Sequence, residues 1–244
     1  MVNFHIFTIF PESLESYFNS SILERAQNKK LIKIKIHDIR KFSKDKHRKV
    51  DDRPFGGGAG MVMKVDPIIR AIESKIKNKK SKILVILTSA SGKSFNQKLA
   101  RNFSQKYTDI AIICGRYEGV DERVSKILQT TRQRRGSPRA ASYPPKARLA
   151  KGGKLQAISI GPYILTGGEL PAMTIVDAVS RHIPGVLGKK ESLEEEKGSY
   201  PVYTRPEVFT HKGKKYTVPK VLMSGDHKKI NEWRRKNSKL EIRN

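Results

Sequence analysis

Two uninterrupted apolar runs, "KILVILTS" (residues 82–89) and "DIAIIC" (residues 109–114), place the strongest constraint on how this chain can fold. A strand with one solvent-exposed face alternates apolar and polar residues, whereas a continuous run of apolar residues is typical of a strand that is covered on both faces. Helical segments lie between such runs; in one of them Asp66 and Pro67 predict a helix start with Asp66 as N-cap. We therefore expect an α/β fold with a mostly parallel sheet and helices on both faces.

The alternation of strands and helices is interrupted by a basic insert at residues 130–156. This stretch is rich in Lys and Arg, has no acidic residue and follows no period, so we expect a mobile basic loop. With 244 residues, the chain has room for one large domain and a small one. We predict a domain at 1–188 that contains the insert, a linker at 189–202 rich in charge, and a second domain at 203–244 that ends in a basic helix.

The charge balance favours a polyanionic partner. Lys and Arg number 50 against 23 Asp and Glu, a formal net charge of +27, which points most simply to nucleic acid. The alternative is a generally lysine-rich proteome, because exposed lysine needs no partner. A single cysteine excludes an internal disulfide and suits a reducing compartment. The N-terminus lacks the basic region of a signal peptide, and no apolar run has membrane-spanning length, so we expect a cytoplasmic protein without membrane contact.

Several familiar motifs are incomplete. "SASGKS" (89–94) resembles the end of a phosphate-binding P-loop, but the first glycine of that motif would fall on Leu87. The glycines at 56–58 lack the spacing of a dinucleotide-binding turn. The histidines include no His-x-x-x-His pair, which disfavours zinc, and we predict no metal ligands. Cys114 closes an apolar strand and is better explained as a packed, inert thiol than as a nucleophile.

What remains is a set of glycines in the turns that follow predicted strands, which we call the glycine corners. In an open α/β sheet, ligands sit at the carboxyl ends of the strands. Backbone groups from several glycine loops could hold a flat polar ring without side chains, although turns also need glycine. The corners are Gly92, Gly115 with Gly119, and Gly161 with Gly167 and Gly168.

Five long motifs are spread over nearly the whole chain, the insert excepted: "DKHRKVDDRPFGGGAGMVM" (45–63), "ICGRYEGVDERV" (113–124), "SIGPYILTGGELPAM" (159–173), "DAVSRHIPGVLG" (177–188) and "YPVYTRPEVF" (200–209). Together they closely resemble bacterial tRNA (guanine-N1)-methyltransferases of the TrmD family.

The resemblance implies a SPOUT fold, in which the parallel α/β domain carries a deep trefoil knot, followed by a small, mainly helical C-terminal domain. It also implies a homodimer whose active sites are shared between subunits. The implied reaction transfers a methyl group from S-adenosylmethionine to N1 of guanosine 37, just 3′ of the anticodon of tRNA, which supports reading-frame maintenance.

By the same resemblance, three glycine-containing segments are expected to hold S-adenosylmethionine. For the apolar members of the set, ordinary core packing is the alternative, and both roles are compatible. The expected donor contacts are Ser89, Ala90, Gly92, Gly115, Tyr117, Glu118, Ile160, Gly161, Pro162, Tyr163, Ile164, Leu165, Gly167 and Gly168.

Two residues are candidates for the catalytic roles that the resemblance implies. Guanine N1 must lose a proton to a carboxylate, and a cation must stabilise the charge that develops on O6. The cation maps onto Arg181, whose alternative role is an ion pair with Asp177, four residues earlier on the same helix. The base maps onto Glu196, where the family has Asp; the alternative is a solvated run of charge. A second departure is Pro162, which stands where the family has Asp and has no N–H to donate.

The tRNA contacts are expected from Arg205, Trp233, Arg234 and Arg235, and the basic insert is expected to touch tRNA phosphate. Trp233 has an alternative role as the core anchor of the small domain. The loop of His47, Arg48 and Asp51–Asp52 is expected near the substrate. The resemblance implies that Mg²⁺ is a cofactor of the family, although this sequence offers no clear set of ligands for it. The competing function is a catalytically weakened SPOUT-fold RNA-binding protein; a SPOUT ribose methyltransferase is a weaker alternative that the long motifs disfavour.

Overall fold

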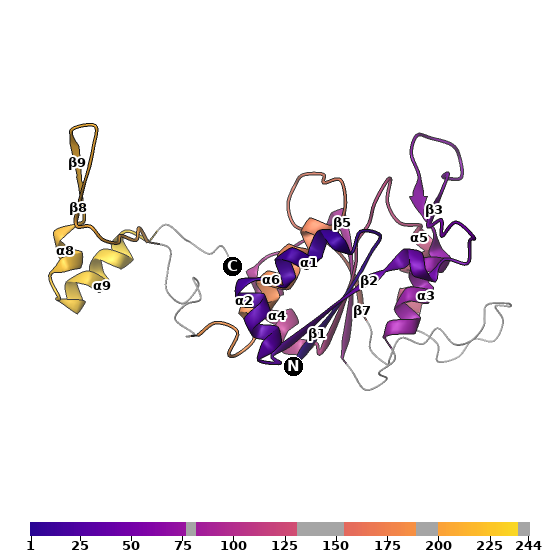
Figure 1. Cartoon of the computed structure of the whole chain (residues 1–244), viewed down its shortest axis with the longest axis horizontal. Coiled ribbons are helices and arrows are strands. Elements are labelled where there is room, and N and C mark those ends of the chain that lie inside the picture. The colour runs from indigo at the N-terminus through magenta and orange to yellow at the C-terminus, as the bar shows by residue number, and fades with distance from the viewer. Residues whose placement is uncertain (77–81, 131–153, 189–199, 239–244) are drawn as a thin grey trace. The chain divides into compact units, whose positions relative to one another are not determined.

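The computed structural model describes residues 1–76, 82–130, 154–188 and 200–238 (Figure 1). They belong to two compact units, Met1–Val186 and Leu187–Asn244. Among the described residues, no helix is both long enough and apolar enough to cross a membrane.

A five-stranded sheet in the order β2-β1-β6-β5-β7 forms the centre of the first unit, and every pairing in it is parallel. All residues of β6 are buried, as the continuous apolar run predicts for a strand with both faces covered. The prediction of an α/β fold around a parallel sheet is confirmed. The strands are β1 (Val2–Thr8), β2 (Ile32–Asp38), β5 (Ile83–Ser94), β6 (Asp109–Ile113) and β7 (Lys154–Ser159).

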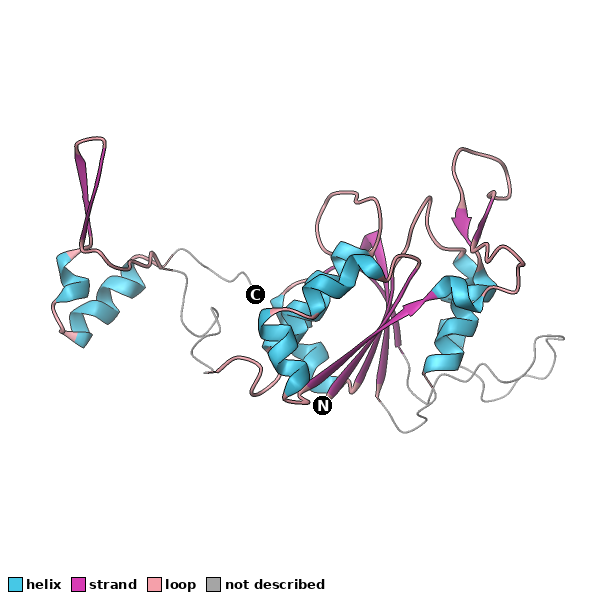
Figure 2. Ribbon diagram, viewed as in Figure 1, coloured by secondary structure: helices cyan, strands magenta, loops and turns pink. Residues whose placement is uncertain are grey.

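Helices cover both faces of the sheet, and each face has its own apolar cluster (Figure 2). On one face Phe4 and Ile6 of β1 pack in a cluster with α1 (Glu12–Phe18), α2 (Ser21–Asn28), α4 (Gln97–Lys106) and α6 (Glu169–Arg181). On the other face Phe7 joins a cluster with α3 (Val65–Lys75), α5 (Glu122–Thr130) and the short 3₁₀ helix η1 (Ile39–Phe42). Residues 4, 6 and 7 thus follow the two-residue period of a strand.

The start of α3 differs from the sequence prediction. Helix α3 begins at Val65 and its N-cap is Lys64, so the prediction that Asp66 caps this helix is wrong. Lys64 remains extended because its N–H donates to the carbonyl oxygen of Val50, at 2.7 Å. Asp66 instead lies in the first turn, where its carboxylate accepts a hydrogen bond from Arg70 Nε at 2.8 Å. An acidic residue there still complements the positive end of the helix dipole.

A small antiparallel ribbon is formed by β3 (Asp51–Asp52) and β4 (Val62–Met63). These two strands connect the glycine-rich loop that contains Phe55 to the body of the first unit.

The second unit contains a two-stranded hairpin as well as helices. The hairpin is formed by β8 (Val208–His211) and β9 (Lys214–Thr217), and it precedes α8 (Lys220–Met223) and α9 (His227–Lys236). Helix α9 begins where the carboxylate of Asp226 accepts hydrogen bonds from the N–H groups of Lys228 and Lys229, both at 3.1 Å. The sequence analysis anticipated the basic helix but not the hairpin.

Candidate active site

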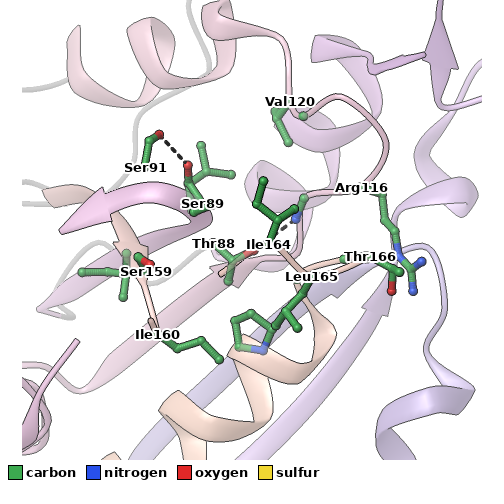
Figure 3. A pocket seen from close by; sticks show the side chains of 18 of the residues that line it. Thr88, Ser89, Ser91, Arg116, Val120, Ser159, Ile160, Ile164, Leu165 and Thr166 are labelled. Atoms are coloured by element: carbon green, nitrogen blue, oxygen red, sulfur yellow. Dashed lines mark hydrogen bonds between the residues drawn. The ribbon is translucent and has the colours of Figure 1, made fainter. Parts of the chain in front are cut away.

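A cavity of about 450 Å³ opens where β5, β6 and β7 end (Figure 3). Its position agrees with the rule that ligands of open α/β sheets sit at the carboxyl ends of the strands. Three segments provide most of the lining: 87–91 in the middle of β5, 115–120 after β6, and 158–168 from β7 into the following loop. Glu122 and Pro171 complete it.

Nearly all of the residues expected to contact the methyl donor line this one cavity. The exceptions are Gly92 and Pro162, which are not among the lining residues. Gly92 has a different role in the fold: a Cβ at this position would lie 2.5 Å from the backbone N of Ile158, so glycine lets β5 and β7 approach. The expected residues that do line the cavity are Ser89, Ala90, Gly115, Tyr117, Glu118, Ile160, Gly161, Tyr163, Ile164, Leu165, Gly167 and Gly168.

Glycines bring the three lining segments into close backbone contact. A Cβ on Gly168 would lie 2.1 Å from Thr88 Oγ1 and 2.6 Å from the Cα of Cys114. The N–H of Gly168 donates to the carbonyl oxygen of Gly115 at 2.8 Å. The Thr88 hydroxyl donates to the carbonyl of Ile113 and accepts from the N–H of Gly115, at 3.1 and 3.2 Å. The three segments are therefore held together by main-chain contacts for which a larger residue at Gly168 leaves no room.

A buried carboxylate stabilises one side of the cavity. Glu169, the first residue of α6, is 5% exposed and accepts hydrogen bonds from Thr8 Oγ1 at 2.6 Å and from Arg116 Nε at 3.1 Å. The Arg116 guanidinium also lies over the ring of Phe10, at 4.6 Å from its centroid. This network connects the loop after β6 to the start of α6, and it fixes a cation beside the cavity. Thr8, Arg116 and Glu169 were all missed as site residues by the sequence analysis.

Polar side chains on β5 and its neighbours add hydrogen-bonding groups. The hydroxyl oxygens of Ser89 and Ser91 are 3.1 Å apart (Figure 3). Ser159 Oγ donates to the carbonyl oxygen of Gly161 at 2.9 Å. The cavity therefore combines apolar walls with hydroxyl and main-chain polar groups, a mixture that suits a nucleoside.

Cys114 takes no part in this surface. It is buried, and burial raises the pKa of its thiol well above the ordinary value. A thiol held in the protonated form is a poor nucleophile, in agreement with its interpretation as a packed residue.

The two residues predicted to be catalytic do not line the cavity within the described chain. Arg181 is the last residue of α6 and is half-buried. Its neighbour Asp177 accepts a hydrogen bond from the hydroxyl of Tyr17, which raises the pKa of this tyrosine to about 12. No ion pair joins Arg181 to Asp177, both of which are described. Glu196 lies outside the described residues, as does most of the basic insert.

A second, larger cavity of about 890 Å³ adjoins the first, and the two share Glu118, Val120 and Glu122. It includes Asp52 of β3, one of the residues that were expected near the substrate. A hydrogen bond from Lys64, whose Nζ is 2.9 Å away, lowers the pKa of Asp52. No group of three or more His, Cys, Asp or Glu side chains within the described ranges is arranged to hold a metal ion.

Apart from the basic insert, the residues expected to bind tRNA belong to the second unit. Trp233 is half-buried, with its ring 6.3 Å from that of Tyr203, so it contributes to packing within this unit. The guanidinium of Arg234 lies 5.2 Å from the ring centroid of Tyr200. Arg205 and Arg235 are exposed.

Known proteins of one family are similar to this chain over almost its whole length. A family model described as "tRNA (Guanine-1)-methyltransferase TrmD" matches residues 2–244. Curated proteins named tRNA (guanine-N(1)-)-methyltransferase are similar to this chain. The protein from Dictyoglomus turgidum is 48% identical over 241 residues, which cover 97% of this chain and 84% of the relative. The protein from Carboxydothermus hydrogenoformans is 47% identical (96% and 82% covered), and that from Clostridioides difficile is 45% identical (97% and 92% covered).

Proposed function

The chain belongs to the TrmD family of tRNA (guanine-N1)-methyltransferases, and we propose that it methylates N1 of guanosine 37 in tRNA with S-adenosylmethionine as the methyl donor. The observation that carries this proposal is the cavity of about 450 Å³, because three sequence segments expected to hold the donor meet there. The names of the relatives favour this enzyme over an RNA-binding protein without turnover.

The cavity fits the donor by its chemistry. Gly115, Gly167 and Gly168 let main-chain atoms form the wall, and a side chain at Gly168 would collide with Thr88. Main-chain N–H and C=O groups in such a wall can recognise an adenine ring without side chains, while Ile160 and Leu165 contact its apolar faces. When bound, S-adenosylmethionine supplies an electrophilic methyl carbon.

We propose that Glu196 accepts the N1 proton of the guanine and that Arg181 stabilises the negative charge that develops on O6. Alignment of the reacting atoms provides much of the remaining catalysis, because methyl transfer is a direct displacement.

We also propose a homodimer whose active sites combine residues of both subunits. Arg181 lies outside the lining of the cavity in one chain, which supports a site completed by a second copy. We propose the trefoil knot of the SPOUT fold for the first unit as well. The close approach of Gly168 to Thr88 and Cys114 supports it, because the loop after β7 lies directly against β5 and the residue that follows β6.

The test of the reaction is a mass-spectrometric analysis of nucleosides after incubation of the purified protein with S-adenosylmethionine and an unmodified tRNA transcript. We expect N1-methylguanosine from a transcript with guanosine at position 37 and none from a matched transcript with adenosine there. A protein that binds both donor and tRNA but forms no product would instead support the RNA-binding alternative.

Subunit sharing is tested by mixing two inactive variants, Arg181→Ala and Gly168→Val. If each site uses both subunits, mixed dimers contain one site with both defects and one intact site, and activity returns. Without sharing, every site retains one defect and the mixture stays inactive.

A further inference from the structure

The hairpin of the second unit presents its side chains to solvent. All residues of β8 and β9 are exposed, including Phe209 at 58% and Tyr216 at 51% of their surface. A hairpin of two short strands is marginally stable in water without packing on one face. Exposed aromatic side chains on such an element indicate a surface that binds a partner.

The strand register places four of these side chains on one face, which we call the hairpin face: Phe209, His211, Lys214 and Tyr216. Phe209 is paired directly with Tyr216, and His211 with Lys214. Paired residues share a face, and so do residues two apart along a strand. The ring contacts agree with this assignment, since Phe209 and His211 stack at 6.5 Å with only 10° between their planes.

The hairpin face combines flat rings with positive charge. Lys214 Nζ lies 5.5 Å from the centroid of the Tyr216 ring, so the cation is held beside the aromatic surface. Residues 200–238 of this unit contain ten Lys and Arg against three Asp and Glu. Aromatic rings with adjacent cations are the combination that binds single-stranded nucleic acid, because each base stacks on a ring while its phosphate meets a charge.

The opposite face of the hairpin lacks this combination. Val208, Thr210, Lys215 and Thr217 alternate with the residues of the hairpin face and include no aromatic side chain. Each face carries one lysine, Lys214 on the hairpin face and Lys215 on the opposite face. The two faces therefore have the same charge and differ in their aromatic rings.

We propose that the hairpin face stacks on unpaired nucleobases of the tRNA substrate, with Phe209 and Tyr216 as the stacking residues and Lys214 as the phosphate contact. Bases inside a helix present only their edges, so a stacking surface selects a loop rather than a stem. The proposal rests on the proposed function for the identity of the RNA, and it adds a site that the predicted contacts Arg205, Trp233, Arg234 and Arg235 do not include.

The experiment measures RNA binding by the full-length protein carrying Phe209→Ala, Tyr216→Ala or both. Loss of a stacked base lowers affinity by about 5- to 150-fold, so we expect at least a fivefold loss for each single variant on an unmodified tRNA transcript. A duplex RNA of the same length as the anticodon stem serves as the second probe, and its affinity should change less than twofold. Tyr216→Phe keeps the ring and should bind as the wild type does.

Two lysine variants provide the matched control for charge. Lys214→Ala should weaken tRNA binding and reduce its salt dependence by about one phosphate contact, whereas Lys215→Ala on the opposite face should do neither. The aromatic variants should leave the salt dependence unchanged, because stacking releases no counterions.

Equal losses on duplex and loop RNA, or unchanged tRNA affinity in the double variant, would overturn the proposal. A change in oligomeric state by light scattering without a change in RNA affinity would also overturn it, since the face would then bind a second copy of the chain. Methylation by the wild-type protein separates this outcome from failure of the proposed function: if N1-methylguanosine forms normally while the double variant keeps its tRNA affinity, only the stacking site is wrong.

Discussion

Arg116 and Glu169 form an ion pair across 53 residues of sequence, with Arg116 Nε 3.1 Å from Glu169 Oε2 beside the cavity. The Glu169 side chain is only 6% exposed, whereas the Arg116 side chain is 25% exposed. Desolvation makes a buried pair a weak source of net stability, but the removal of one partner leaves the other charge uncompensated. The pair is therefore best understood as a device that holds the loop after β6 against the start of α6.

The substitution Glu169→Gln should destabilise the first unit by about 2–4 kcal/mol, because it leaves the guanidinium of Arg116 without its counter-charge. It should also weaken donor binding, since Arg116 and its neighbours line the cavity. Urea unfolding and calorimetric titration with S-adenosylmethionine measure the two effects. Asp66→Asn is the control: its pair with Arg70 is about 40% exposed on both sides, so the loss should stay below about 1 kcal/mol. Equal losses in both variants would contradict a special role of the buried pair.

The substitution Gly168→Ala should abolish measurable donor binding while the protein still folds. The new methyl group would lie 2.1 Å from Thr88 Oγ1 and 2.6 Å from the Cα of Cys114, so the backbone has to shift. Overpacking of this kind costs about 1–3 kcal/mol of stability. Gly188→Ala is the matched control, because its Cβ would meet nothing within 4 Å. Donor affinity that survives at Gly168→Ala would show that the cavity is not the donor site.

The sheet could be predicted from the sequence because the pattern that identifies each strand lies within a few consecutive residues. The run at 109–114 reports that β6 is covered on both faces, and the whole strand is buried. The glycine corners after β6 and β7 likewise mark strand ends where the cavity lies, whereas Gly92 lies inside β5 and outside the lining.

The parts that escaped prediction depend on contacts between distant segments. The residues next to Glu169 in the sequence, two glycines before it, do not indicate that its carboxylate is buried and paired. Its partners Thr8 and Arg116 are 161 and 53 residues away. The hairpin was missed for a different reason. Its turn uses Lys212 and Gly213, both with positive φ, instead of the familiar Asn-Gly, although short alternating segments on either side were a usable signal.

The catalytic assignment gives a prediction that compares neighbouring glutamates. Glu196→Gln should lower kcat by about a hundredfold or more if Glu196 removes the N1 proton, since the amide cannot act as a base. Glu194→Gln and Glu195→Gln keep the same local charge change and should retain nearly full activity. Single-turnover methylation of tRNA measures the step directly. A larger effect at either neighbour would transfer the role of base to that residue.

Arg181→Ala should lower kcat by about 10²–10³-fold with an unchanged donor affinity, because the cation is needed only when charge develops on O6. Arg181→Lys should recover part of the activity, since a cation returns without the planar guanidinium. Donor titration and single-turnover rates separate binding from chemistry. A loss of donor affinity equal to the loss in kcat would show that Arg181 acts in binding.

Two histidines in the sheet should make the first unit sensitive to acid. The nitrogens His5 Nδ1 and His37 Nε2 are 3.1 Å apart, and Asp109 lies 3.7 Å from His5. Burial is the main reason why the pKa of His37 is lowered to about 4, and the charges of His5, Lys75 and Lys35 lower it further. Burial also lowers the pKa of His5, against the opposing effect of Asp109.

The sign of the pH dependence follows from proton binding. Between pH 6.5 and about 4 the unfolded chain binds protons at His37 that the folded state does not, so stability is complete above pH 6.5 and falls as the pH drops through this window. His37 should contribute a loss of about 1–2 kcal/mol after allowance for its partial exposure. Urea unfolding from pH 7.5 to 4.5 should therefore show a smaller decline for His37→Gln than for the wild type, whereas the exposed His47→Gln should follow the wild type. Parallel declines in all three proteins would mean that the buried pair is not the origin of the acid sensitivity.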